Sequence, residues 1–423
     1  MSQRQNAFKN AHLQRARRRS TVVASGGVVL DGSVDHEASA MDRRKFLKTG
    51  GGLVAGLASL GSAGCAAGQA GTVGAARPVR RLVPVRASWD RVIRTTVGLR
   101  PYRPSGFVLR PERLDEKLLV HNFGHGGAGM SLSWGTGRMA AELALEREER
   151  TAAVVGCGVV GLTTARQLQR RGFDVTIYAA DVPPNTTSNM SLASWTPTSG
   201  LVDAPKRTPV WDEQFRRSAR IAYPELQLLV GRGYGVSWLE SYALRDTPPS
   251  EGTGAEDPLL PEDLRASGTV FGPGDHPFPT AYAVMRPSLR IEPSVYLDRL
   301  VTDVREAGGR IEIRRFADRE DLASLPEPVV VNCTGLGAGA LVADREMTPL
   351  KGQLTILMPQ PEVDYATFGA ATPTAGGFVH MSPRRDGIAL GGTSVEGDGS
   401  LEVDVEARKR IVEAHIELFG RMG

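Results

Sequence analysis

Three glycines in the pattern G-x-G-x-x-G could bind the phosphates of a dinucleotide. Gly156, Gly158 and Gly161 follow a short apolar run and open a helical pattern of residues. In such a turn the first glycine makes a tight bend, the second lets the backbone approach a pyrophosphate, and the third lets helix and strand pack closely. The helix N-terminus adds free N–H groups and a partial positive charge. We therefore predict a dinucleotide site, with an ordinary glycine-rich turn as the alternative.

A carboxylate lies near the position where a dinucleotide site needs one. Residues 151–155 and 174–178 are predicted strands, and residues 160–171 form the predicted helix between them. Asp181 follows the second strand, where an acid can accept hydrogen bonds from a ribose 2′-hydroxyl, which favours FAD or NAD over a 2′-phosphorylated cofactor. Its spacing from Gly156 is slightly long, so a solvated loop residue is the alternative.

A second glycine-dense turn precedes the first one along the chain. Residues 124–129 read Gly-His-Gly-Gly-Ala-Gly, between a predicted strand at 117–121 and a predicted helix at 131–145. Bare backbone in front of a helix N-terminus can stabilise negative charge that develops on a ligand. Upstream, residues 98–104 contain two arginines, Arg100 and Arg103, in a segment that two prolines stiffen.

Together these segments resemble the D-amino-acid oxidase family. The pattern G-x-R-P-x-R-P at 98–104 and the pattern H-N-x-G-H-G-G-x-G at 121–129 resemble that family's C-terminal signature, and residues 156–161 resemble its N-terminal FAD fingerprint. Other segments similar to the family are 184–188, 193–197, 331–335, 351–353 and 391–393. The resemblance implies an α/β fold, in which a Rossmann-type FAD-binding domain is interleaved with an α+β substrate domain that has a mixed or antiparallel sheet.

The order of the segments departs from the family. There the arginine segment and the second glycine turn close the chain, whereas here both precede the FAD fingerprint. We predict a circular permutation joined at 146–150, with a truncated duplication as the alternative. The predicted domains are 87–150, which completes the site, and 151–423, which holds the FAD-binding domain and the substrate domain. The substrate part is predicted at 205–310 and 345–400.

The resemblance assigns three residues to the substrate. Arg100 matches an arginine that clamps the substrate carboxylate with its planar fork, and a surface ion pair is the alternative. Tyr282 falls where a tyrosine hydroxyl binds the same carboxylate, unless it is an ordinary half-buried strand tyrosine. Gly127 matches a glycine whose carbonyl receives the substrate amine.

The resemblance also assigns contacts to FAD. Thr186, Thr187 and Ser188 match residues at the flavin phosphates and ring edge, and Phe316 matches a backbone position at the adenine. The cysteines and histidines show no metal-ligand spacing, so no metal site is predicted. The predicted cofactor-binding residues are Gly126, Ala128, Gly129, Gly156, Gly158, Val159, Val160, Gly161, Asp181, Thr186, Thr187, Ser188, Ala193, Ser194 and Phe316.

The implied reaction is the FAD-dependent oxidation of a D-amino acid. Hydride passes from Cα to flavin N5, the imino acid hydrolyses to a 2-oxo acid and ammonia, and oxygen reoxidises the flavin to give hydrogen peroxide. Orientation supplies most of such catalysis. A flavoprotein dehydrogenase and an impaired FAD-binding relative without oxidase turnover stay open, and an NAD-linked enzyme is the third alternative. Arg286 and Arg290 either favour an acidic D-amino acid or face solvent.

The charge of the chain is concentrated at its start. Residues 1–86 hold 14 Lys and Arg against 4 Asp and Glu, whereas the remainder holds 37 against 43, so no nucleic-acid partner is expected. The expected partners are a small D-amino acid and oxygen. The sequence does not indicate an oligomeric state, and a homodimer is compatible with it.

Paired arginines explain much of the basic start. Arg43 and Arg44 precede a mild apolar run at 50–64, which resembles a twin-arginine signal followed by a linker to residue 86. Residues 1–40 are either a disordered basic tail or an untranslated extension. The run is too short for a stable membrane span. We expect export to the periplasm or the cell exterior, with either cleavage or lipid anchoring at Cys65.

Overall fold

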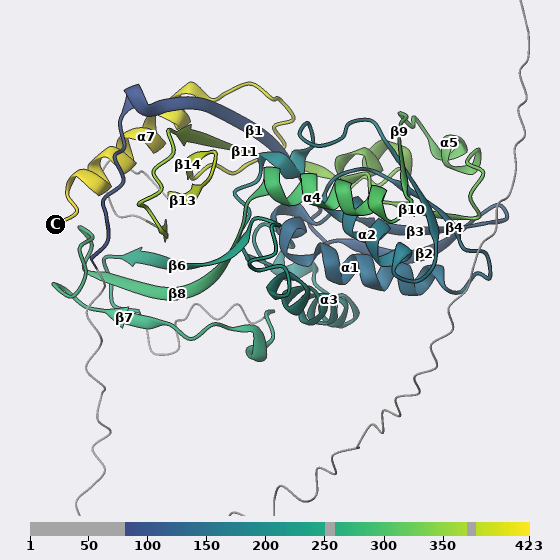
Figure 1. The fold of residues 1–423 in the computed structure, drawn as a ribbon, viewed down its shortest axis with the longest axis horizontal. Helices are drawn as coiled ribbons and strands as arrows, with labels where there is room; N and C mark the ends of the chain where they lie inside the picture. Colours follow the sequence, from purple (N-terminus) through teal and green to yellow (C-terminus); the bar gives the residue numbers. More distant parts are fainter. Residues whose placement is uncertain (1–80, 250–258, 370–377) are drawn as a thin grey trace, which may run out of the picture. The chain divides into compact units, whose positions relative to one another are not determined.

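The computed structural model describes residues 81–249, 259–369 and 378–423. The predicted tail at 1–40, the twin-arginine signal and Cys65 lie outside the described residues. Within this part the chain forms a nine-stranded sheet, called here the large sheet, and a six-stranded sheet, called the small sheet (Figure 1).

The small sheet has the Rossmann-type arrangement that the glycine pattern predicts. Its strand order is β2 (Val108–Leu114), β3 (Lys117–Phe123), β10 (Val329–Asn332), β4 (Thr151–Val155), β5 (Asp174–Ala179) and β9 (Arg310–Ile313). All neighbours are parallel except β2 and β3. Every residue of β10 is buried, as expected of a parallel strand that is covered on both faces. Helix α2 (Val159–Gln169) connects β4 to β5, close to the predicted bounds.

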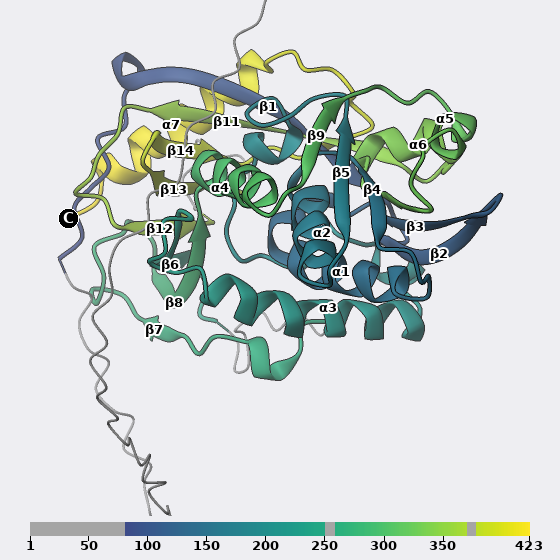
Figure 2. The ribbon, with the colours of Figure 1, turned by 45° about the vertical axis from the view of Figure 1, so that its right-hand side comes forward.

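Helix α1 (Gly129–Ala144) packs between α2 and α3 (Pro209–Gln227), beside the small sheet (Figure 2). Two glycines inside α1 make this close packing possible. A Cβ at Gly135 would lie 1.9 Å from the Ser218 carbonyl oxygen, and one at Gly137 would lie 3.0 Å from the Thr164 nitrogen. The backbone of α1 is therefore fixed against both neighbours, and this fixes the glycine turn at its N-terminus.

The large sheet is mainly antiparallel. Its main path is β1 (Val92–Tyr102), β11 (Thr348–Leu357), β14 (Gly387–Gly391), β13 (His380–Arg384), β12 (Tyr365–Phe368), β6 (Val236–Arg245), β8 (Tyr282–Ile291) and β7 (Thr269–Phe271). The short strand β15 (Val395–Glu396) pairs with β11, and β12 runs parallel to β6. Helix α7 (Val405–Gly420) packs on β11 and β14. The predicted fold class, a Rossmann-type domain with a mixed sheet, is confirmed.

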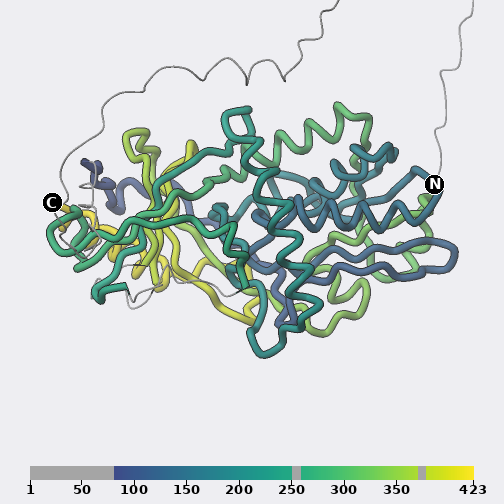
Figure 3. Tube along the Cα trace, turned by 90° about the horizontal axis from the view of Figure 1, so that it is seen from below, coloured from purple at the N-terminus to yellow at the C-terminus, as the bar shows by residue number. Residues whose placement is uncertain are grey.

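The chain passes repeatedly between the two sheets. Strand β1 belongs to the large sheet, β2–β5 to the small one, β6–β8 to the large one, β9 and β10 to the small one, and β11–β15 to the large one. In Figure 3 the purple and blue trace of residues 92–123 accordingly passes from the yellow C-terminal part of the chain to the hairpin of β2 and β3 in the small sheet. The remaining helices are α4 (Pro293–Glu306), α5 (Arg319–Ala323) and α6 (Ala338–Leu341).

Most of the arginine segment is a strand, because residues 98–102 lie inside β1. Pro101 stands opposite Pro349 of β11. Proline is tolerated there because β1 is an edge strand of the sheet and needs no second ladder of hydrogen bonds. Packing also begins within the predicted linker, since Leu82 and Val85 are buried in the core that contains Phe419.

In residues 81–249, 259–369 and 378–423 no helix is long and apolar enough to cross a membrane. The same residues contain no group of three or more His, Cys, Asp and Glu side chains placed to hold a metal ion.

A buried hydrogen bond ties α1 to α4. The Trp134 indole N–H donates to the Tyr296 hydroxyl at 2.7 Å, and both side chains are buried. Tyr296→Phe leaves the indole donor unpaired, so we expect the free energy of unfolding to fall by about 1–3 kcal/mol. Urea denaturation measures this loss. The control is Tyr282→Phe, since the half-buried Tyr282 hydroxyl has no hydrogen bond within the described residues; an equal loss in both variants would contradict the assignment.

Candidate functional site

A cavity of about 940 Å³ lies where the parallel strands of the small sheet end. The residues after β3, β4, β5, β9 and β10 line it, and residues 98–101 of β1 and 352–354 of β11 close it from the large sheet. Ligands of open α/β sheets bind at this edge, beyond the carboxyl ends of the strands. The volume is near the upper end of the range for small-molecule sites, about 300–1,000 Å³.

The first glycine pattern forms a wall that only glycine can make. Gly156 has a φ of 116°, and a Cβ there would lie 2.4 Å from the Cys333 carbonyl oxygen. A Cβ at Gly161 would lie 1.9 Å from the Gly156 carbonyl oxygen. Helix α2 is preceded by Gly158, which has no side chain to cap it, and its first turn holds no acidic residue, so the partial positive charge of its N-terminus is available to an anion.

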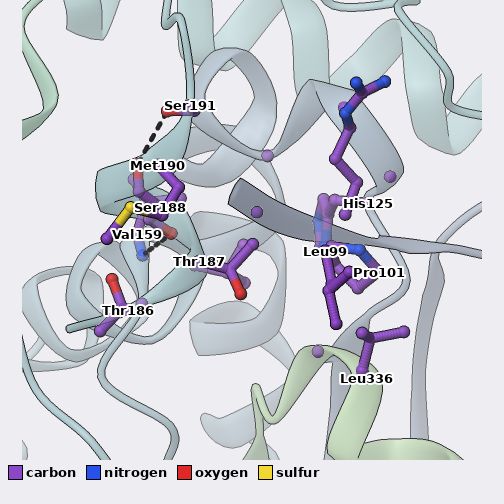
Figure 4. Close-up of a pocket in the computed structure, with 18 of the residues that line it drawn as sticks. Leu99, Pro101, His125, Val159, Thr186, Thr187, Ser188, Met190, Ser191 and Leu336 are labelled. Atoms are coloured by element: carbon purple, nitrogen blue, oxygen red, sulfur yellow. Dashed lines mark hydrogen bonds between the residues drawn. The ribbon is translucent and has the colours of Figure 1, made fainter. Parts of the chain in front are cut away.

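The turn at 186–191 lies against the start of α2. The Val159 N–H donates to the Ser188 hydroxyl at 3.0 Å. Thr186 is held by the hydrogen bond from its hydroxyl to Asn189 Oδ1 at 2.8 Å. Figure 4 shows Thr186 and Ser188 on one side of the cavity, with Leu99 and Pro101 of β1 on the other. The cavity wall therefore has hydroxyl groups at the start of α2, and one of them already accepts a hydrogen bond from the first N–H of that helix.

The second glycine turn packs backbone against backbone. The Gly127 N–H donates to the Gly200 carbonyl at 3.1 Å, and a Cβ at Gly126 would lie 1.9 Å from the same oxygen. The Nε2 atom of the buried His125 ring is hydrogen-bonded to the Thr136 hydroxyl at 3.0 Å. Burial lowers the pKa of His125 to about 3. A neutral histidine therefore holds the turn that leads into α1, and α1 also has no side-chain cap.

Arg100 brings an unpaired cation into the cavity. Its guanidinium donates to the Thr393 carbonyl at 2.9 Å and to the Ser394 hydroxyl at 3.4 Å. It forms no ion pair within the described residues, and burial lowers the pKa of the guanidinium from its ordinary value. A half-buried charge without a counter-charge is incompletely stabilised, so this end of the cavity favours an anionic ligand. The alternative of a surface ion pair gains no support.

The far end of the cavity follows β5 and β9. Asp181 lines it and forms an ion pair with Arg315 at 3.5 Å, with both side chains exposed. Phe316 also lines it and contacts Tyr178 edge to face, with the ring centroids 6.1 Å apart. The Arg314 guanidinium lies 4.8 Å from the centre of the Phe316 ring. This end of the cavity offers an acid and an aromatic ring together.

Most of the predicted site residues meet at this cavity. Those that line it are Arg100, Gly126, Gly127, Gly129, Gly156, Gly158, Val159, Val160, Asp181, Thr186, Thr187, Ser188, Ala193, Ser194 and Phe316. Two others stand behind the wall, because Ala128 is fully buried and Gly161 packs on the carbonyl of Gly156.

Tyr282 does not belong to this group, contrary to its prediction. It is the first residue of β8, opposite Arg245 of β6, and it does not line the cavity. Five strands of the large sheet separate β8 from the strand that holds Arg100. The structure therefore does not bring Tyr282 and Arg100 together at one site.

Sequence reasoning missed three ring residues of the cavity wall. Phe368 of β12, Phe378 and His380 of β13 line the cavity with Arg100. The available indication was a histidine within the otherwise apolar run of residues 378–381. The sequence does not show which residues surround His380, because they depend on the order of the strands in the large sheet.

Comparisons with known proteins identify relatives of the chain. A family model described as "FAD dependent oxidoreductase" matches residues 24–143 and 151–422. A D-amino-acid oxidase of Rubrobacter xylanophilus is 31% identical over 265 residues, which cover 62% of this chain and 74% of the relative. A D-amino-acid oxidase of Streptomyces coelicolor is 34% identical over 274 residues, covering 65% and 79%. A glycine oxidase structure from Bacillus cereus aligns with a TM-score of 0.47 at 14% identity, covering 64% and 78%.

The fit of Gly161 against the loop gives a direct test of cofactor binding. Gly161→Ala places a methyl group on the Gly156 carbonyl, so the loop must move away from the cavity wall. We expect at least tenfold weaker flavin binding, because a distortion of about 1.4 kcal/mol suffices for a factor of ten. The ratio of flavin absorbance to protein absorbance after gel filtration measures how much flavin stays bound to each variant. Gly420→Ala in α7, where nothing lies within 4 Å, is the control; equal flavin content in both variants would contradict the site.

Proposed function

The chain belongs to the FAD dependent oxidoreductase family, and from this premise we propose that it oxidises D-amino acids to 2-oxo acids, ammonia and hydrogen peroxide. One observation carries the proposal. The cavity joins a glycine fingerprint and the N-termini of α1 and α2, neither with an acidic residue in its first turn, to the unpaired guanidinium of Arg100. The two curated relatives described above, which are named D-amino-acid oxidases, support the same substrate class.

The residues of the cavity fit FAD. The start of α2 and the Ser188 turn would hold the phosphates, and the glycines of the second turn with Ala193 and Ser194 would lie along the ring system. Asp181 and Phe316 would hold the adenosine. Glycine at 156 lets the wall of this cradle pack on the Cys333 carbonyl, where a Cβ would lie 2.4 Å from the oxygen. Bound there, FAD supplies a hydride acceptor that oxygen can reoxidise.

Arg100 orients the substrate. Its fork can hold a carboxylate through two parallel hydrogen bonds, which fixes the direction of the Cα–H bond. The Gly127 carbonyl would receive the amine. The Cα–H bond breaks with its electron pair, the amine loses a proton, and water converts the resulting imine to a 2-oxo acid and ammonia. Oxygen takes up two electrons and two protons to give hydrogen peroxide.

The cavity offers little general acid–base machinery. Among the described lining residues the only carboxylate is Asp181, which lies at the adenosine end. Burial lowers the pKa values of His125 and His380 to about 3, so both rings are neutral near pH 7. These groups are poorly matched to proton abstraction, which requires a pKa near the working pH. This supports a reaction in which orientation, rather than a side-chain base, supplies the rate.

The positions of Arg286 and Arg290 do not support a preference for a substrate with an acidic side chain. The Arg290 guanidinium donates to the Ser237 hydroxyl at 3.1 Å and to the Pro383 carbonyl at 3.0 Å. Neither Arg286 nor Arg290 lines the cavity.

We also propose that the chain is a circular permutation of its family. The family model matches two stretches, and the gap between them contains the predicted joint at 146–150. A permutation requires residue 423 to lie close to the start of residues 87–150, called here the early segment. In support, the Tyr365 hydroxyl donates to the Val83 carbonyl at 2.9 Å and contacts Met422 Sδ at 3.6 Å.

Export by the twin-arginine route remains part of the proposal. Arg43, Arg44 and Cys65 lie outside the described residues, so it depends on the sequence pattern. That route suits a protein whose cofactor is inserted before export.

Turnover by Arg100 variants tests the proposed function. Arg100→Leu removes both charge-assisted hydrogen bonds to the carboxylate, so we expect kcat/KM for D-amino acids to fall about 100-fold or more. Peroxide release measures it, with L-isomers giving none. Arg286→Leu is the matched control outside the cavity. Flavin-loaded protein that releases no peroxide with any D-isomer would favour the alternatives of a dehydrogenase or an impaired relative.

A rearranged chain tests the permutation. It begins at residue 151 and carries residues 82–148 after residue 423, which keeps Leu82 and Val85 in their core. We expect it to bind flavin like the original, because the new junction joins segments that already lie together. Residues 151–423 alone should bind none, since they lack β1 and β3. A rearranged chain that stays insoluble or without flavin would contradict the permutation.

A further inference from the structure

His380 stands at the Arg100 end of the cavity. It lies opposite Gly391 of β14, and a Cβ at Gly391 would lie 2.2 Å from the Cε1 atom of the His380 ring. Two residues further on, the Thr393 carbonyl accepts the hydrogen bond from Arg100. The imidazole and the guanidinium therefore both lie near the C-terminal end of β14, and both residues line the cavity.

Aromatic rings enclose the imidazole. Phe368 stacks on it with centroids 5.9 Å apart, and Phe378 lies at 5.7 Å. His380 Nδ1 is closed off from solvent and has no hydrogen-bond partner in the described part of the chain. A proton on Nδ1 would be a buried, unpaired donor, which costs more than an unpaired acceptor. The neutral ring therefore carries its proton on Nε2, the nitrogen that is not closed off in this way.

A carboxylate held by Arg100 needs further donors. Its two oxygens offer about four acceptor sites, of which a guanidinium fork satisfies two. The rings of Phe368 and Phe378 have no donor, and the predicted tyrosine, Tyr282, lies off the cavity. Of the three rings at this end, only that of His380 can donate.

We propose that the Nε2–H of His380 donates a hydrogen bond to the carboxylate that Arg100 binds, in the role expected of Tyr282. This inference depends on the proposed function, because the carboxylate is that of the amino-acid substrate. His380 thus fixes the second oxygen of the carboxylate and, with it, the rotation of the substrate about its bond to Cα.

The donor should work without changing charge near pH 7. Burial, and then the charges of His415 on α7 and Arg100 on β1, lower the pKa of His380 to about 3. His415 is itself buried, donates from Nδ1 to the Ile411 carbonyl at 2.7 Å, and has a pKa lowered to about 4. Both histidines therefore stay neutral well below pH 7. A neutral donor gives a carboxylate affinity that is constant between about pH 5 and pH 8.

Binding of benzoate, a carboxylate without an amine, tests the inference on the full flavin-loaded protein. The perturbation of the flavin absorbance gives its Kd. We expect His380→Leu to raise that Kd about 10- to 100-fold, as for the loss of a hydrogen bond to a charged group. His380→Gln places an amide N–H near the Nε2 position and should restore most of the affinity, whereas His380→Asn places it near Nδ1 and should not.

The controls separate this role from others. His276→Leu, a half-buried histidine away from the cavity, should leave the Kd unchanged. An unchanged Kd in His380→Leu, with a loss in Ser394→Ala instead, would overturn the inference and transfer the role to that hydroxyl. Affinity that rises about tenfold from pH 7 to pH 5 would also contradict it, since it indicates a charged ring.

The outcome is distinguishable from failure of the proposed function. If no D-amino acid is oxidised but benzoate binding still depends on His380, the carboxylate site stands and the reaction is wrong. If D-amino acids are oxidised and His380→Leu changes neither KM nor the Kd for benzoate, the reaction stands and the role of His380 is wrong.

Discussion

Backbone pairing between the early segment and much later strands is the constraint on which the site depends. Strand β1 pairs with β11 in an almost continuous register from Val92 to Tyr102, and β3 runs parallel to β10. The first pairing brings Arg100 to the cavity, and the second places the glycine turn at the carboxyl edge of the small sheet. Neither position is available to residues 151–423 alone, so the cavity wall is complete only when the early segment lies in both sheets.

The electrostatics of the cavity follow from this arrangement. Two helix N-termini without acidic caps face it, and an unpaired guanidinium stands at one end. The acid among its described lining residues, Asp181, is paired with Arg315 at the other end. The cavity is therefore positive where phosphates and a carboxylate would lie. Burial, and after it the charges of His415 and Arg100, lowers the pKa of His380, so the Arg100 end combines a permanent charge with an uncharged ring.

The part of the site that sequence predicts is the part that local geometry determines. Gly156 and Gly126 have to be glycine because of a positive φ and close backbone approaches, and such requirements appear directly as sequence patterns. The parallel strands and α2 were predicted close to their bounds for the same reason. Tyr282 and His380 show the limit. Which strand residue faces Arg100 depends on the order of the strands in the large sheet, and that order arises from pairings between distant segments.

Anaerobic reduction of the bound flavin tests the central claim most directly. The flavin absorbance of the full-length protein is followed without oxygen while L-amino acids and then D-amino acids are added. We expect only D-isomers to bleach the flavin, and we expect the admission of air to restore its colour with release of peroxide. A bound flavin that no D-isomer reduces, or that L-isomers reduce equally well, would contradict the assignment of the cavity.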